Sequence, residues 1–256
     1  MKTFLSFFLL VFCASILSAG EKRGAVAFTF DDYHGPRWLK ADAVFKKYNA
    51  HATVFIVGGL NKEKLTTMKK LQAAGHSIGL HSLHHLDAYT PKTGKLHREY
   101  FEKEVKAQYD LCKKENIHVM SFAYPNNRRN EESDKLLFKH FDYLRAGLGK
   151  PKKMIFYPLD KLEKKMMLGG QGIGKYYKTD PKQIKYLMDQ AAKSNSLIVF
   201  FSHDIRPNAP GISMPSELLE ELLAYAAKLN MNVIGFNEIP ELRKKYGKVK
   251  EKPLKI

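Results

Sequence analysis

The chain alternates between short apolar runs and longer amphipathic stretches over most of its 256 residues. Runs such as 25–30 and 197–202 have the length and side chains of buried strands, whereas 62–73 and 181–193 repeat their apolar residues at helical spacing. Strands that alternate with helices build parallel sheets, because each helix returns the chain to the same edge. With no internal repeat and no linker, the sequence predicts one α/β domain built on a parallel sheet or barrel.

Two stretches need separate comment. Residues 96–114 are predicted to form one long charged helix, and 232–236 a closing strand. The stretch 147–179 mixes glycines, lysines and short apolar runs, and its sequence does not predict an element.

The first twenty residues have a different composition from the rest. Lys2 is followed by an almost wholly apolar run, then by the small residues 18–20 and by charge at 21–23. This pattern is typical of a secretory signal peptide, and the run is short for a membrane span. We therefore expect an exported protein, periplasmic, cell-surface or extracellular, whose domain covers 21–256 and keeps no stable membrane span after cleavage. Only Cys112 then remains, so no disulfide within the chain is expected.

The chain is strongly basic, with a formal net charge of +17, of which the predicted signal peptide carries one lysine. Such an excess attracts acidic glycans, anionic lipids or nucleic acids. We expect no nucleic-acid partner for an exported protein. Most of the lysines are spread along the chain in pairs, which is also typical of an ordinary solvated surface.

Polar side chains follow several of the predicted strands at the point where each ends. Asp31 and Asp32 come after 25–30, His81 ends the strand at 77–80, and His203 ends the strand at 197–202. In parallel sheets and barrels these carboxyl ends meet at one edge, where sites form. The shared placement therefore predicts a functional site.

The residue types at this edge favour a metal site. One of two adjacent carboxylates is relieved of repulsion if it holds a cation, and His81 and His85 are four residues apart, so that both imidazoles can reach one ion. Two histidines and a carboxylate leave room for water and substrate, as in catalytic zinc sites. Taken alone, Asp31 and Asp32 also suit an acidic turn or helix cap, and the histidine pair suits a solvated helix.

At this point the motifs resemble those of the polysaccharide deacetylases, carbohydrate esterase family 4. The segment 28–32 (FTFDD) resembles the first motif of the family, and 75–85 (GHSIGLHSLHH) resembles the second. The segment 197–204 (LIVFFSHD) resembles the last. The resemblance implies a distorted (β/α) barrel with seven or eight parallel strands. It also implies a divalent metal, zinc or alternatively cobalt or nickel, on Asp32, His81 and His85, with Asp31 as general base and His203 as general acid.

The third motif of the family departs from its usual form here. Where the family has Arg-Pro-Pro-Tyr, residues 123–126 read Ala-Tyr-Pro-Asn. Tyr124, Pro125 and Asn126, together with Arg145, remain the expected substrate-binding positions, and the backbone N–H of Asn126 is expected to face the oxyanion. Two arginines are candidates for the one that Ala123 replaces, and two acids for the carboxylate of the fourth motif: Arg145 or Arg206, and Asp160 or Asp180.

The resemblance implies an enzyme that removes N-acetyl groups from an amino-sugar polysaccharide or oligosaccharide. Two alternatives stay open: an O-deacetylase or other small-amide hydrolase on the same site, and a metal-containing glycan-binding protein without turnover. An acetylated glycan is the expected partner, and the oligomeric state is left open. Aromatic side chains are candidates for stacking on sugar rings: Tyr33, Trp38, Tyr89, Tyr124, Tyr176 and Tyr177.

Overall fold

A closed ring of parallel strands forms the centre of the computed structural model, which describes residues 23–89, 99–148 and 156–247. Within these residues the ring runs β1-β2-β3-β4-β5-β7-β8 and closes where β8 pairs with β1. Its strands are β1 (Ala25–Phe30), β2 (Thr53–Ile56), β3 (Ser77–Leu80), β4 (Val119–Ala123), β5 (Tyr143–Gly147), β7 (Met166–Gly172) and β8 (Ser196–Ser202). The predicted (β/α) barrel is confirmed, with seven strands in the ring.

The barrel is distorted between β1 and β2. Only the carboxyl end of β1 pairs with β2, where Thr29 and Phe30 lie beside Thr53 and Val54 at the start of β2. The first half of β1 pairs instead with β11 (Asn232–Val233), and the backbone N–H of Phe236 donates to the Thr53 hydroxyl, 2.9 Å away. The segment after β11 therefore fills the bottom of the barrel, while its top stays open.

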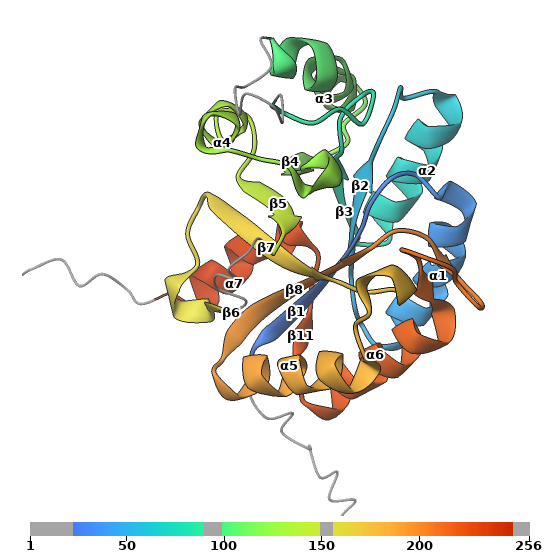
Figure 1. The fold of residues 1–256 in the computed structure, drawn as a ribbon, viewed down its shortest axis with the longest axis vertical. Helices are drawn as coiled ribbons and strands as arrows, with labels where there is room; N and C mark the ends of the chain where they lie inside the picture. The colour runs from blue at the N-terminus through green and yellow to red at the C-terminus, as the bar shows by residue number, and fades with distance from the viewer. Residues whose placement is uncertain (1–22, 90–98, 149–155, 248–256) are drawn as a thin grey trace, which may run out of the picture.

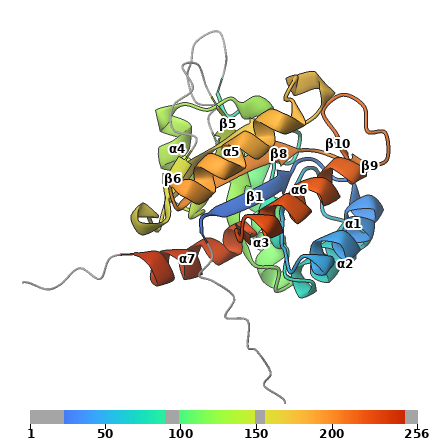
Figure 2. The ribbon, with the colours of Figure 1, turned by 90° about the horizontal axis from the view of Figure 1, so that it is seen from below.

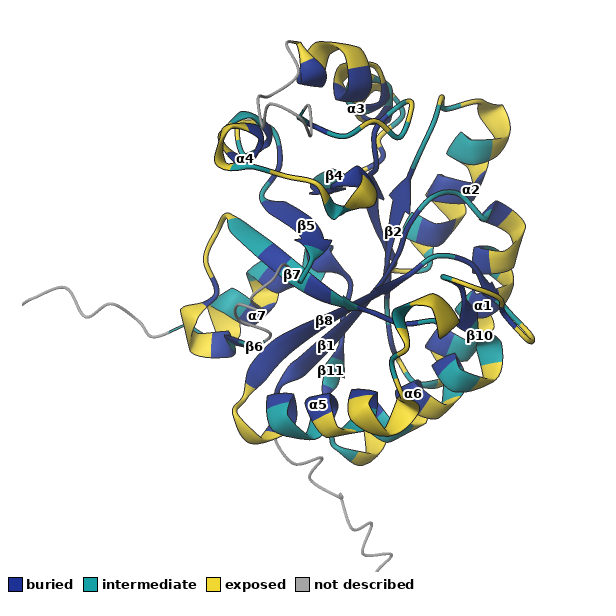
Figure 3. Ribbon diagram, in the orientation of Figure 1, coloured by how far each residue is buried: buried dark blue, intermediate teal, exposed yellow. Residues whose placement is uncertain are grey.

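Helices surround the ring (Figure 1): α1 (Gly35–Lys47), α2 (Lys62–Ala73), α3 (Lys106–Lys114), α4 (Glu131–Leu137), α5 (Pro181–Lys193), α6 (Ser216–Lys228) and α7 (Ile239–Tyr246). Asn61, Asn130 and Asp180 cap three of them, each accepting a backbone N–H with its side chain. Viewed from below, α5 lies across β8 (Figure 2). Strands β1, β2, β3 and β8 are wholly buried, β7 is partly exposed, and the helices expose their outer faces (Figure 3).

The pleat of the strands separates two hydrophobic cores. In β1, Val26 and Phe28 point outward and pack under the helices, whereas Ala25 and Ala27 point into the barrel. Larger side chains from other elements, including Phe55, fill the rest of the interior. Because side chains alternate between faces, the inward row of β1 continues through Thr29 to Asp31 just past the strand. The same parity brings Arg145 of β5 and His203 after β8 to the barrel mouth.

Most predicted elements are confirmed, and the differences have physical causes. The 147–179 stretch contributes the short antiparallel strand β6 (Phe156–Pro158) and β7. The glycines of β7 weaken its strand pattern in the sequence. Of the predicted helix at 96–114, residues 99–114 are described; they hold a π-helical turn over Phe101–Val105 before α3. The predicted closing strand at 232–236 shortens to β11.

The predicted signal peptide at 1–20 lies outside the described residues. No helix in the described part of the chain combines the length and the apolar content that crossing a membrane requires.

His76, at the start of β3, is a buried neutral imidazole. Its Nδ1 accepts the backbone N–H of Ala52 at 3.0 Å, so the ring proton lies on Nε2, which faces Asp42 Oδ1 at 3.1 Å. A second proton on Nδ1 would oppose that backbone N–H. Burial lowers the pKa of His76 below its ordinary value, and Asp42 offsets only part of this.

This geometry predicts a specific pH dependence of stability. Since the folded pKa of His76 is lower than the unfolded one, the unfolded state binds more protons below about pH 6.5, and the free energy of unfolding falls as the pH falls through that range. Each pKa unit of depression is worth about 1.4 kcal/mol. Urea unfolding of the metal-free protein at pH 7.5 and 5.5 measures how much free energy of unfolding is lost on acidification, and this loss should be smaller for His76→Gln than for the unchanged chain.

His118→Gln is the control, because it alters an exposed histidine and should lose as much free energy of unfolding as the unchanged chain. An equal loss in all three proteins would contradict the prediction.

Candidate metal centre and active site

Three predicted ligands converge at the open top of the barrel. Asp32 follows β1, and His81 and His85 lie at and after the end of β3. One ligand atom from each lies within 4.8 Å of the others. Asp32 Oδ1 is 3.7 Å from the Nε2 atoms of both His81 and His85. Two ligands of a tetrahedral zinc ion stand about 3.4 Å apart, so this donor set fits a divalent cation.

A backbone contact orients His81 toward this centre. Its Nδ1 lies 2.8 Å from the carbonyl oxygen of Ala123, which can only accept, so Nδ1 carries the proton and the Nε2 lone pair faces Asp32. Burial lowers the pKa of His81 to about 4. His81 therefore stays neutral and able to bind a metal at any pH well above 4.

The backbone around the site is held in an unusual conformation. Asp32, Ser82, His85, Asn126 and Asn127 all have φ between 53° and 70°, in the left-handed region. Residues other than glycine adopt this region at a cost in free energy, although asparagine and aspartate tolerate it best. The cluster indicates that the fold, rather than local preference, sets the direction of these side chains.

Asp31 is buried beside the metal centre and is only 3% exposed. Its Oδ2 accepts a hydrogen bond from Arg145, while its Oδ1 has no hydrogen-bond partner among the described residues. Burial alone would raise the pKa of Asp31, but the charge of Arg145, with help from His81 and His203, holds this pKa below its ordinary value. Asp31 is thus favoured as a carboxylate, and its Oδ1 is available to accept a proton.

Arg145 comes from β5 and is fully buried. Its guanidinium lies between two rings, 4.8 Å from the centroid of Phe201 and 5.4 Å from that of Phe55. Its Nη1 donates to Oδ1 of Asn127 at 2.8 Å, and that oxygen also accepts the backbone N–H of Gly147 at 2.7 Å. Asn127 and the two rings therefore fix the arginine against Asp31.

Of the two arginines considered as replacements at the Ala123 position, the structure brings Arg145 to Asp31. Arg206 instead points its Nε at Asp204, 3.5 Å away. Neither candidate for the fourth-motif carboxylate lines the site: Asp180 caps α5, and Asp160 is exposed in a short turn after β6.

His203 follows β8 and lines the same pocket as His81 and His85. Its Nε2 is 3.9 Å from Asp32 Oδ2, and its Nδ1 is buried without a hydrogen-bond partner in the described part of the chain. The backbone carbonyl of His203 accepts the indole N–H of Trp38 at 3.1 Å. This bond holds the backbone from which the ring of His203 extends.

Of the residues predicted to bind substrate, only Tyr124 and Asn126 line the site pocket. Arg145 is fully buried against Asp31 and is not part of the lining. Asn126 lines the site pocket, and its amide donates to Asp87 Oδ1 at 2.9 Å. Tyr124 also lines the pocket, but its hydroxyl donates to Asp134 at 2.9 Å, within α4. Pro125 is buried next to it and is not part of the lining.

The site opens into a pocket of about 430 Å³. Three of its lining residues were not predicted: Asn127 and Ile212 lie outside the recognised motifs, and Phe201 lies within the 197–204 motif but was not expected to line the site. Tyr176 and Tyr177, two of the predicted stacking aromatics, lie at its rim, and Tyr176 is 71% exposed. The lining consists of Asp31, Asp32, His81, His85, Tyr124, Asn126, Asn127, Arg128, Tyr176, Tyr177, Phe201, His203 and Ile212.

The family model described as polysaccharide deacetylase matches residues 19–146, half of the chain. This chain therefore belongs to the polysaccharide deacetylase family, as its motifs had indicated.

Curated relatives include two cell-wall deacetylases. A peptidoglycan-N-acetylglucosamine deacetylase of Bacillus cereus is 33% identical over 85 residues, which are 33% of this chain and 31% of the relative. The peptidoglycan-N-acetylmuramic acid deacetylase PdaA of Bacillus subtilis is 27% identical over 99 residues, 38% of each chain. The chain thus spans less than half the length of these relatives.

Solved structures share the fold over most of this chain. Peptidoglycan deacetylase PdaC from Bacillus subtilis has a TM-score of 0.57 at 17% identity and covers 87% of this chain and 93% of its own. A family 4 acetyl xylan esterase from Clostridium thermocellum, solved with a cobalt ion, has a TM-score of 0.55 at 18% identity, covering 85% and 91%. A pseudoenzyme of the same family from Bacillus anthracis has a TM-score of 0.57 at 16% identity, covering 85% and 65%.

The geometry predicts one metal ion per chain. Zinc titrated into chelator-treated protein, followed by calorimetry, should bind with one-to-one stoichiometry, and Asp32→Ala or His81→Ala should weaken binding at least about a hundredfold, because each removes one of three ligands. His84→Ala is the matched control, since His84 adjoins His85 but pairs with Glu104 at 2.8 Å. If His84→Ala lost binding while His81→Ala kept it, the ligand set would be wrong.

Proposed function

We propose that this chain is an exported, divalent-metal-dependent deacetylase that hydrolyses N-acetyl groups of an amino-sugar glycan. The observation that carries the proposal is the buried Asp31 carboxylate, which has one oxygen free directly beside the three-ligand centre. A protein that only bound glycan would need no such base. The family supports deacetylation of a polysaccharide, and the names of the relatives support the acetamide as the bond cleaved.

Asp32, His81 and His85 would hold the metal, zinc by their chemistry, with cobalt or nickel as alternatives. When bound, such an ion polarises the acetyl carbonyl and makes water a better nucleophile. Asp31 Oδ1 accepts the proton of the attacking water. The backbone N–H of Asn126 stabilises the oxyanion at the pocket wall.

His203 donates a proton to the leaving amine, and acetate and the free amino sugar result. Its Nε2 is 3.9 Å from Asp32 Oδ2, and His203 lines the same pocket as Asp31. Two different side chains can therefore serve the two proton transfers, Asp31 as the base and His203 as the acid.

This proposal predicts metal-dependent acetate release from N-acetylglucosamine oligomers. Asp31→Asn and His203→Ala should each lower kcat/KM at least about a hundredfold, as expected for loss of a general base or acid, while still binding the metal. Both variants should be measured beside the unchanged chain, with and without added zinc or cobalt.

The alternatives make different predictions in the same assay. Release from O-acetylated xylan but not from the amino-sugar oligomers would indicate an esterase. Tight metal binding without release from these substrates or from peptidoglycan fragments would indicate a glycan-binding protein and end the enzymatic proposal.

We assign Arg145 and Asn127 to positioning Asp31. Because Arg145 holds the pKa of Asp31 low, removing its charge raises that pKa, and the acid limb of kcat/KM against pH should move to higher pH in Arg145→Met. Asn127→Ala should move the limb in the same direction by a smaller amount, since the arginine stays but loses its anchor. Arg145→Met should also cost stability, by about 3–5 kcal/mol for a broken buried pair.

Arg206→Met is the matched control for this shift. This substitution removes a nearby arginine that does not contact Asp31, so the acid limb of kcat/KM against pH should stay where it is in the unchanged chain. If the acid limb moved in Arg206→Met but not in Arg145→Met, the assignment would be reversed. Melting temperatures of all variants separate loss of folding from a change in the profile.

A further inference from the structure

The ring of His203, the proposed general acid, lacks a hydrogen bond that would orient it within the described part of the chain. A histidine that transfers a proton is usually oriented by a hydrogen bond to its second ring nitrogen. In His203 that nitrogen is Nδ1, which is buried and has no partner among the described residues. The direction of the imidazole therefore depends on how the backbone of residues 202–204 is held.

Two of these residues are held through their backbone carbonyls. The carbonyl of Ser202, the last residue of β8, accepts the backbone N–H of Asp31 at 2.9 Å. The carbonyl of His203 accepts the indole N–H of Trp38 at 3.1 Å, and Trp38 is itself buried. The backbone of the acid is thus fastened to the first-motif segment and to α1.

Asp204, directly after the acid, is held through its side chain. Its carboxylate is buried, and Oδ1 accepts the Nε–H of Arg37 at 2.7 Å and the backbone N–H of Ile205 at 2.9 Å. Arg206 lies farther away, with its Nε 3.5 Å from Oδ2. A buried carboxylate requires a cation in contact with it, and the shorter distance makes Arg37 the main partner.

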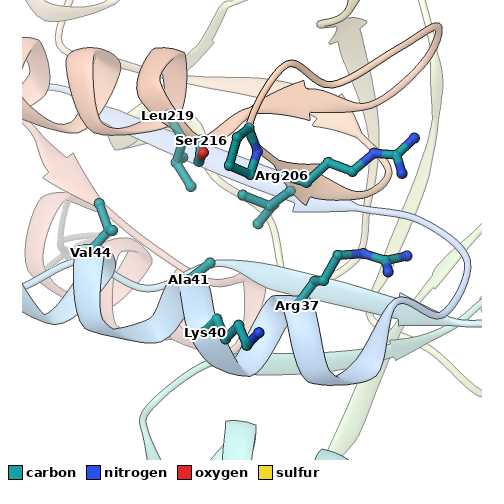
Figure 4. A pocket seen from close by; sticks show the side chains of 9 residues that line it. Arg37, Lys40, Ala41, Val44, Arg206, Ser216 and Leu219 are labelled. Atoms are coloured by element: carbon teal, nitrogen blue, oxygen red, sulfur yellow. The ribbon is translucent and has the colours of Figure 1, made fainter.

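Arg37 reaches Asp204 from the first turn of α1, which begins three residues after the metal ligand Asp32. Its side chain lines a cavity of about 300 Å³ between α1 and the segment 205–219, and Arg206 extends along the same end of this cavity (Figure 4). Arg37 is exposed, whereas Asp204 is buried. Arg37 can therefore be truncated from the solvent side without removing a side chain from the hydrophobic core.

We propose that Arg37 and Asp204 are positioning residues for His203. Their ion pair ties the start of α1, close to the metal centre, to the residue that follows the acid, and so holds the imidazole at the pocket. The inference rests on the proposed deacetylase function, in which His203 gives a proton to the leaving amine. A displacement of about 1 Å in a reacting group can lower a rate about a hundredfold.

Two acetyl substrates with different leaving groups test this role. The amine of an N-acetylglucosamine oligomer needs a proton to leave, whereas the nitrophenolate of para-nitrophenyl acetate leaves without one. We expect Arg37→Ala to lower the ratio of kcat values, oligomer to ester, about ten- to a hundredfold, with the KM values little changed. His203→Ala should lower the same ratio further, because it removes the acid itself.

Lys40→Ala is the matched control for the loss of charge. Lys40 lies about one turn further along α1, lines the same cavity and makes no ion pair with any described residue, so the ratio should stay the same. Because Arg37→Ala enlarges an open cavity beside Asp204, added guanidinium should restore part of the ratio, whereas sodium chloride at equal ionic strength should not. Zinc stoichiometry and melting temperatures report separately on the metal centre and on folding.

The outcomes separate positioning from support of the fold. If Arg37→Ala lowered both kcat values equally, or left both as they are in the unchanged chain, the positioning role would be overturned while the deacetylase proposal stood. If the unchanged chain released no acetate, the proposed function would fail, and NMR would decide the positioning role instead. The imidazole signal of His203, assigned by its loss in His203→Ala, should shift in Arg37→Ala and not in Lys40→Ala; a signal that stayed in place would overturn the inference.

Discussion

The site depends on one buried ion pair, between Asp31 and Arg145. A carboxylate at the mouth of an apolar barrel is costly unless a cation compensates it, and a fully buried guanidinium is equally costly alone. Each therefore requires the other, and both are held by groups that have no charge of their own: the rings of Phe55 and Phe201 and the amide of Asn127. The rest of the centre is arranged around this pair, with the metal ligands on the side open to solvent.

This arrangement explains how the chain differs from the usual third motif of its family. The arginine missing beside Tyr124 is replaced by one from the next strand, and the pleat parity of β5 points it inward. The asparagines that follow Pro125 suit the left-handed backbone that the turn requires. Both line the pocket, and Asn127 also orients Arg145.

Much of the fold could be predicted from the sequence, because strands and helices alternate with clear periods; the boundaries of β3, α2 and α5 follow directly from that pattern. The candidate metal ligands could also be predicted: Asp32 and His81 follow the ends of two strands of the ring, His85 lies four residues beyond His81, and the resemblance to the family motifs selects Asp32 rather than Asp31. Other features depend on contacts between distant residues and leave no local signal. The glycine-rich β7 was hidden for this reason, and so were the choice between Arg145 and Arg206 and the anchoring role of Asn127.

The closure of the barrel through β8 and β1 has a consequence for how the protein matures. These strands pair along their whole length although about 171 residues separate them in the chain, as the bond from Thr29 to Phe200 shows. Contacts between such distant segments form slowly and late in folding. Asp31 and His203 extend from these two strands, so the groups proposed as base and acid come together only when the last strand of the ring has docked. A partly synthesised or partly folded chain can hold the first-motif and second-motif ligands and still lack a complete site.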